Sequence, residues 1–249
     1  MVRILVLFLV CFNLSSFEGE FKILGQDYAP YNWKEGAEVK GALVDLYTKA
    51  CQQLKIKCTF DIMPLKRGSQ LLEDGSAHMF MALQKTAERE KLFYFSEPIT
   101  YADINIYTQK GKGTELVSDE QLAGYSLGVL GNSATEKIGL KIKDKIPTLL
   151  VIPENDQQTV IKKLAAGRYG DKGALLANKQ IVDYYAKQFN VSKDIEVRYT
   201  KESNDFFVIF SKKSVPETMV SEFNKVIAEL KNSGDMKKIY EKWGINLPR

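Results

Sequence analysis

The sequence has little of the chemistry that several functional classes require. It contains one histidine, His78, and three cysteines. A single histidine without partners provides neither a metal site nor a catalytic pair. We therefore interpret His78 as a structural or surface residue, and we expect no metal and no cofactor. After residue 12, no apolar run approaches the length of a membrane span.

The chain also lacks a strong excess of one charge. Its formal net charge is +4, and acidic and basic residues are interspersed. A surface that follows a nucleic-acid backbone needs a run of Lys and Arg with interleaved aromatic residues, and no such run is present. We therefore exclude nucleic acid as a partner. No exact internal repeat and no low-complexity segment is found.

Residues 1–19 have the pattern of a secretory signal peptide. Arg3 supplies the positive charge, and residues 4–12 form an apolar run that is too short to span a bilayer. We expect cleavage between residues 16 and 20, and we interpret Cys11 as part of the signal peptide and not as a lipid-anchored cysteine. The exported chain of roughly 230 residues is large enough for one large domain or two small ones.

Two cysteines, Cys51 and Cys58, remain in the exported chain. An oxidising destination permits a disulfide, although their spacing alone does not establish the required geometry. We favour a structural disulfide, and the alternative is two separate buried thiols. Neither cysteine has a neighbouring histidine or acid that indicates a nucleophilic role.

Predicted strands and helices alternate along the chain, in two units of similar size. The first unit has strands over 21–25, 58–63 and 79–83, and helices over 43–54 and 65–73 and from 86. A β-rich run over 104–108 leads to a hinge-like linker at 109–113. The second unit has strands over 125–130, 149–153 and 174–177, with helices over 156–166 and 181–189 and another that follows the turn 131–136. A further strand is predicted over 195–199, followed by polar residues to 205 and an apolar run over 206–210, and helical periodicity covers 219–230 and 236–243. This alternation predicts an α/β fold with a parallel-containing sheet.

Arg89 lies where a predicted helix begins after a buried strand. The strand covers 79–83, and Glu88 stands in the first turn of the helix, where the helix dipole favours an acid. Ligands bind at the carboxyl ends of strands in open α/β sheets. A guanidinium beside free backbone N–H groups suits a bidentate grip on a carboxylate. The alternative is that Arg89 pairs with a nearby glutamate, such as Glu88 or Glu97, on a solvated face.

A similar turn, residues 131–136, follows the strand predicted over 125–130. Asn132 and Ser133 are good N-cap residues, and the N–H groups beside them are free to bind an anion. Many strand-to-helix turns have this composition, so the turn is only a weak indication of a binding site.

Short motifs in a fixed order make nearly all of the exported chain resemble the family-3 extracellular solute-binding proteins of ABC importers. These are polar amino-acid binders of the type II periplasmic fold. The motifs of the first half are Tyr28-Ala29-Pro30-Tyr31, Val44-Asp45-Leu46, Thr86-Ala87-Glu88-Arg89 and Phe95-Ser96-Glu97-Pro98. Those of the second half are Leu122-Ala123-Gly124, Leu164-Ala165-Ala166-Gly167-Arg168 and Lys242-Trp243-Gly244. No single motif is specific, and the order carries the resemblance.

The resemblance implies two lobes joined by crossing strands, each lobe a mixed and mostly parallel sheet flanked by helices. The ligand would lie in the cleft between the lobes and be enclosed by hinge closure. Lobe 1 would hold residues 20–108 and 204–249, and lobe 2 residues 109–203. The resemblance also implies carboxylate recognition by Arg89, a contribution from the lobe-2 turn, and a pocket formed by the aromatic loop after the first strand. The candidate ligand-binding residues are Asp27, Tyr28, Trp33, Arg67, Ala82, Gln84, Arg89, Asn132, Ser133, Ala134 and Asn178.

The chain departs from the family pattern where an acid commonly pairs with the ammonium group of the ligand. The best-matching position is Asn178, close to an unusual insertion at 169–173. A neutral amide gives up the charge-assisted bond that a desolvated ammonium needs. This departure argues against a standard α-amino acid as the ligand.

Two further departures lie in the first half. His78 replaces the acid of a Gly-x-x-Asp motif, and Arg67 follows the second strand in Pro64-Leu65-Lys66-Arg67. At the cleft edge Arg67 would bind a second anionic group of the ligand. The alternative is that Arg67 pairs with Glu73 or Asp74 outside the site.

These features favour a bacterial, periplasmic and monomeric binding protein without enzymatic activity. It would capture a small carboxylate-bearing solute, a polar amino acid or a related organic acid, and deliver it to an ABC permease in the inner membrane. One alternative is ligand sensing for a chemoreceptor or sensor kinase. Another is an enzyme of the cyclic-dehydratase type on the same fold, for which Asp27 is the one clear acid–base candidate and has no partner.

Overall fold

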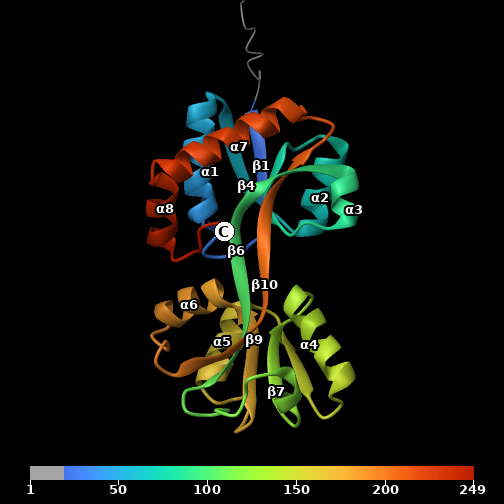
Figure 1. Ribbon diagram of the computed structural model, residues 1–249, viewed down its shortest axis with the longest axis vertical. Coiled ribbons are helices and arrows are strands. Elements are labelled where there is room, and N and C mark those ends of the chain that lie inside the picture. Colours follow the sequence, from blue (N-terminus) through green and yellow to red (C-terminus); the bar gives the residue numbers. More distant parts are fainter. Residues whose placement is uncertain (1–19) are drawn as a thin grey trace, which may run out of the picture.

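The computed structural model describes residues 20–249, so the predicted signal peptide lies outside the described residues. Two lobes are joined by long strands (Figure 1). One eight-stranded sheet runs through both lobes in the order β4-β1-β5-β10-β6-β9-β7-β8. The predicted α/β fold with a mixed sheet is confirmed. Among residues 20–249, no helix is long and apolar enough to cross a membrane.

The first lobe is built on three parallel strands. They are β1 (Glu20–Gly25), β4 (Lys57–Ile62) and β5 (Met79–Leu83). Its helices are α1 (Ala42–Leu54), α2 (Leu65–Asp74), α3 (Ala87–Leu92), α7 (Glu217–Asn232) and α8 (Asp235–Trp243). A small hairpin of β2 (Trp33–Glu35) and β3 (Glu38–Lys40) was not predicted.

The second lobe repeats this plan with fewer elements. Its strands are β7 (Ser126–Leu130), β8 (Leu150–Glu154) and β9 (Gly173–Asn178), and β7 pairs in parallel with both others. Its helices are α4 (Ala134–Lys145), α5 (Gln157–Ala165) and α6 (Lys179–Gln188), preceded by the short 3-10 helix η1 (Asp119–Leu122).

The lobes are connected by β6 (Phe93–Gln109) and β10 (Ile195–Ser211), which pair antiparallel along their whole length. Figure 1 shows the two strands running side by side from one lobe to the other. The strand predicted over 195–199 and the apolar run over 206–210 both lie in β10, but the sequence did not indicate that one strand continues through both. The polar residues between them belong to β10 because their backbone groups pair with β6. Since their side chains are polar, this part of the strand shows no apolar alternation that would predict a strand from the sequence. The segment 109–113, predicted as a hinge, begins where β6 ends: the Lys110 N–H donates to the Asp194 carbonyl, next to the start of β10.

Each lobe has its own apolar core. In the first lobe, α1 buries Leu43, Leu46, Tyr47 and Ala50, a spacing of three, four and seven residues that places them on one helical face. They pack with residues of the sheet and of α7 and α8. In the second lobe, two clusters of buried residues lie around β7 and β9. Separate cores let each lobe behave as a unit.

A disulfide joins Cys51 in α1 to Cys58 in β4, with a Cα–Cα distance of 6.2 Å. The two cysteines are therefore not separate thiols. His78 has a structural position in the same lobe. Its Nδ1 accepts a hydrogen bond of 2.9 Å from the Lys22 N–H, and its ring stacks on Phe21 with centroids 4.8 Å apart.

Candidate functional site

A cavity of about 510 Å³ lies between the lobes and is lined by residues of both. Its wall is formed where strands end and helices begin, because the carboxyl ends of parallel strands meet at one edge of a sheet. The first lobe contributes Gln26, Asp27, Tyr28, Leu65, Leu83, Gln84, Thr86 and Arg89. The crossing strands contribute Ala102, Ile104, Asn204 and Phe206, and the second lobe contributes Leu130, Gly131, Asn132, Ser133, Ala134, Thr135, Lys137, Gln157 and Asn178.

Arg89 is held against this wall by the helix start that the sequence predicts. The Thr86 side chain caps α3 and accepts a hydrogen bond of 3.3 Å from the Arg89 N–H. The Arg89 Nη1 donates to the Gln84 carbonyl at 2.7 Å, which fixes the guanidinium at the end of β5. Partial burial lowers the pKa of Arg89, and the nearby Glu88 opposes that shift. A guanidinium stays protonated at neutral pH in any such environment.

No carboxylate among residues 20–249 forms an ion pair with Arg89, whereas Glu90 pairs with Lys85 at 2.9 Å. The Arg89 guanidinium has five N–H donors. One of them donates to the Gln84 carbonyl. Arg89 lines the cavity, and a guanidinium with unused donors suits the two oxygens of a carboxylate.

The turn before α4 faces Arg89 from the second lobe. Ser133 caps the helix by accepting bonds from the N–H groups of Thr135 at 3.2 Å and Glu136 at 3.3 Å. Asn132 adopts a positive φ of 56°, and its N–H donates to the Glu136 carboxylate at 2.6 Å. The N–H groups of Ser133 and Ala134 have no acceptor among the described residues. They can donate to a ligand oxygen.

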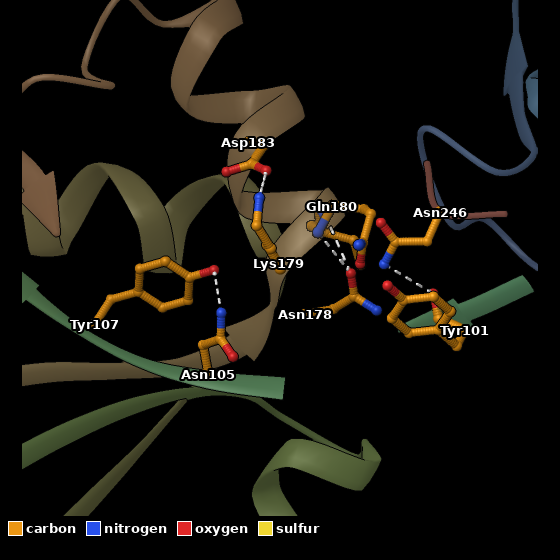
Figure 2. Close-up of polar contacts among 9 residues, drawn as sticks. Tyr101, Asn105, Tyr107, Asn178, Lys179, Gln180, Asp183 and Asn246 are labelled. Atoms are coloured by element: carbon orange, nitrogen blue, oxygen red, sulfur yellow. Dashed lines mark hydrogen bonds and ion pairs between the residues drawn. The ribbon is translucent and has the colours of Figure 1, made fainter. Parts of the chain in front are cut away.

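Asn178 ends β9 and caps α6. Its Oδ1 accepts bonds from the N–H groups of Gln180 at 2.9 Å and Ile181 at 3.3 Å. Figure 2 shows this oxygen turned toward the first turn of α6 and the amide nitrogen pointing away from it. The Nδ2 donates to the Tyr28 hydroxyl of the opposite lobe at 3.2 Å. Burial raises the pKa of Tyr28 to about 12, so its hydroxyl stays neutral.

Three charged side chains line the cavity: Asp27, Arg89 and Lys137. Asp27 follows β1 and is exposed, and partial desolvation raises the pKa of its carboxyl group. Lys137 is an exposed residue of α4. Neither forms an ion pair with another residue of the described chain. The wall therefore carries two cationic groups and one anionic group. Residues 20–249 contain no cluster of His, Cys, Asp or Glu suited to a metal ion.

Three of the sequence candidates do not line this cavity. Trp33 lies between Tyr184, with ring centroids 5.7 Å apart, and Trp243, at 5.3 Å. It touches the second lobe outside the cavity, because the β2–β3 hairpin carries it there. Ala82 is half-buried against the core of the first lobe.

Arg67 is exposed on α2 and borders a separate surface hollow of about 600 Å³, together with Glu73, Asp74 and Lys213. Arg67 therefore lies outside the cavity, beside Glu73 and Asp74 as the alternative expected, but within the described chain it forms no ion pair with either of them.

Sequence reasoning missed several lining residues, and four of them lie on the crossing strands. Ala102 and Ile104 on β6, and Asn204 and Phe206 on β10, follow the two-residue alternation of one sheet face. The resemblance implied crossing strands, but it did not indicate which of their side chains face the cavity. Lys137 lies four residues after Ser133, one helical turn further on the same face of α4.

Comparisons with known proteins agree with this arrangement. The model of the bacterial extracellular solute-binding proteins, family 3, matches residues 23–246. The arginine-binding extracellular protein ArtP of Bacillus subtilis (strain 168) is 22% identical over 243 residues, covering 93% of this chain and 89% of that protein.

Two solved structures share the fold. An ancestral arginine-binding protein bound to arginine has a TM-score of 0.73 and 24% identity, covering 90% of this chain and 98% of its own. An ancestral cationic amino acid solute-binding protein has a TM-score of 0.76 and 21% identity, covering 90% and 95%. At these identities the two structures support the fold alone.

Proposed function

The chain belongs to the bacterial extracellular solute-binding proteins of family 3, and we propose that it captures a small carboxylate-bearing solute between its two lobes. The solute would be a polar amino acid or a related organic acid. Residues 20–108 and 204–249 would form one lobe and residues 109–203 the other. The cavity of about 510 Å³ suits a small molecule.

The observation that carries this proposal is the half-buried guanidinium of Arg89. It is fixed by Gln84, forms no ion pair within residues 20–249, and lines the cavity between the lobes. A cation left partly desolvated and unpaired is costly, and a ligand carboxylate offsets that cost with a charge-assisted bond. The free N–H groups of Ser133 and Ala134 would receive oxygen atoms of the same ligand from the other lobe.

Binding would favour closure of the lobes. A ligand that contacts Arg89 and the α4 turn together does so only when the lobes are close, so it shifts the population toward the closed state. The crossing strands β6 and β10 would bend to permit this motion. Ligand capture then needs no catalytic group, and Asp27, which has no acid–base partner, would not act as one.

We further propose that the protein is exported, with removal of residues 1–19, and works as a monomer in the periplasm. It would deliver the solute to an ABC permease of the inner membrane. The relative ArtP is named as arginine-binding, which makes a cationic amino acid one candidate. The two cationic groups of this cavity, Arg89 and Lys137, favour a more anionic solute instead.

A thermal-shift screen of the purified protein tests the proposal. The screen would contain amino acids, di- and tricarboxylates and small aromatic acids. A ligand at a hundred times its dissociation constant adds about 2.7 kcal/mol to the free energy of unfolding, which is several degrees in melting temperature. A hit among these acids supports the proposal. No shift with any carboxylate at millimolar concentration would contradict it.

A further inference from the structure

We propose that the site selects carboxylates that present an oxygen atom, and not an ammonium group, to Asn178. The ligand class would be hydroxy acids, keto acids and dicarboxylates without an amine at that position. This inference rests on the proposed function, since it assumes that the cavity holds a small carboxylate. It assigns specificity to Asn178 through hydrogen bonds that the structure shows.

The oxygen of Asn178 is already committed. Its Oδ1 accepts two backbone bonds, from Gln180 at 2.9 Å and Ile181 at 3.3 Å, and a side-chain amide oxygen has two lone pairs. The residue is 3% exposed, so water is largely excluded from it. Exchanging the amide oxygen and nitrogen would set an NH2 group against two backbone donors. The N-cap therefore fixes which end of the amide reaches the cavity.

The nitrogen of Asn178 presents donors to the other lobe. One Nδ2–H bond goes to the Tyr28 hydroxyl at 3.2 Å. Because the neutral Tyr28 oxygen accepts this bond, its own O–H is left to donate to a further acceptor, which a ligand oxygen provides. Asn178 and Tyr28 both line the cavity. An ammonium group placed here would meet hydrogen-bond donors and lose its hydration without compensation.

Several other oxygen atoms of the wall already accept hydrogen bonds, whereas the side-chain oxygens of Asn132, Gln157 and Asn204 accept none within residues 20–249. The Gln84 carbonyl accepts from Arg89 at 2.7 Å, and the Thr86 hydroxyl accepts from the Arg89 N–H. The Ser133 hydroxyl accepts from the first turn of α4. Gln26, at the end of β1, uses its carbonyl for the Asn32 amide at 2.5 Å.

Asp27 is the one carboxylate among the residues that line the cavity, and it is exposed. Because Arg89 and Lys137 also line the cavity, the lining has an excess of positive charge. An amine held by Asp27 is the competing arrangement, and it would make recognition of an amino acid depend on Asp27 and not on Asn178.

The test compares matched acids in calorimetric titrations of the wild-type protein and Asn178→Asp. Each pair differs by one group: 2-hydroxyglutarate with glutamate, phenyllactate with phenylalanine, and the 2-hydroxy analogue of arginine with arginine. Aspartate is also a good N-cap residue, so the variant retains the cap of α6 while placing a carboxylate at the wall. Circular dichroism and the melting temperature check its fold, and Asp27→Asn is the companion variant.

We expect the wild-type protein to bind the hydroxy acid of its preferred pair at least tenfold more tightly than the amino acid. Asn178→Asp should reduce or reverse that ratio, and Asp27→Asn should preserve it. Tighter binding of the amino acid by the wild-type protein would overturn this inference and leave the proposed function standing. An equal ratio in wild type and Asn178→Asp would also overturn it. Binding of no member of any pair, and of no simple dicarboxylate, would contradict the proposed function itself.

Discussion

The Tyr28 hydroxyl and the Asn178 amide nitrogen lie 3.2 Å apart and form a hydrogen bond between the two lobes. Tyr28 belongs to the loop after β1, and Asn178 joins β9 to α6. The bond therefore connects the loop after the first strand of one lobe to the start of helix α6 in the other, at the wall of the cavity. Trp33 and Tyr184 make a second contact between the lobes, with ring centroids 5.7 Å apart.

Tyr28→Phe should weaken ligand binding severalfold, because it removes the acceptor of the Asn178 amide and the O–H that we propose donates to the ligand. Leaving a buried amide N–H unpaired should also cost about 1 kcal/mol in the free energy of unfolding. Tyr47→Phe is the matched control, since the Tyr47 hydroxyl donates to the Met81 carbonyl within one lobe. It should lower stability similarly and leave affinity unchanged. Equal affinity loss in both variants, by calorimetry, would show that stability and not the bond between lobes explains the effect.

Trp33 should report lobe closure by fluorescence. The chain contains two tryptophans, and Trp33 packs against Tyr184 of the other lobe as well as against Trp243. A change in the distance between lobes alters its environment, even though it lies outside the cavity. Ligand titration should change the emission of the wild-type protein, and Trp33→Phe should remove most of that change. If the fluorescence change is undiminished in Trp33→Phe, it arises from Trp243 and not from Trp33.

His78 should make stability depend on pH in the mildly acidic range. Desolvation, with a smaller effect from Lys22, lowers the pKa of His78 in the folded protein below its ordinary value. The unfolded chain then binds more protons near pH 6, so the contribution of His78 to stability is complete above about pH 6.5 and is lost as the pH falls. Protonation would also add a hydrogen to the Nδ1 that accepts the Lys22 N–H.

His78→Gln provides the control for this prediction, because an amide oxygen is an acceptor that does not titrate. Urea unfolding at pH 7.5 and pH 5.5 should show a steeper loss of stability in the wild-type protein than in His78→Gln. Identical losses in the two proteins would mean that other groups carry the pH dependence.

The sequence predicted the parts of the site that depend on local patterns. Arg89 follows a buried strand and a helix cap, and those two features alone place it at the edge of the sheet. The same reasoning located Ser133 and the α4 turn, and the order of motifs predicted the two-lobed fold. Cys51 and Cys58 lie close in the sequence, and the structure joins them in a disulfide.

Features that depend on the packing of distant segments were not accessible in this way. Trp33 packs against Tyr184 and Trp243, and Arg67 borders a separate hollow, so neither residue lines the cavity. Lys137 was overlooked because the sequence does not distinguish it from Lys141 and Lys145, two other exposed lysines of α4. The continuity of β10 was hidden because polar residues in a crossing strand are stabilised by backbone pairing with β6, which leaves no apolar pattern.

The central claim is that Arg89 holds the carboxylate of the ligand, and calorimetric titration of Arg89→Ala tests it most directly. The titrant is the best-binding acid from the thermal-shift screen, and Arg67→Ala is the control because Arg67 lies outside the cavity. Losing a partly buried charged partner should cost about 3 kcal/mol of binding free energy, which is more than a hundredfold in dissociation constant. Arg67→Ala should bind as the wild-type protein does. Unchanged affinity in a folded Arg89→Ala protein would contradict the account.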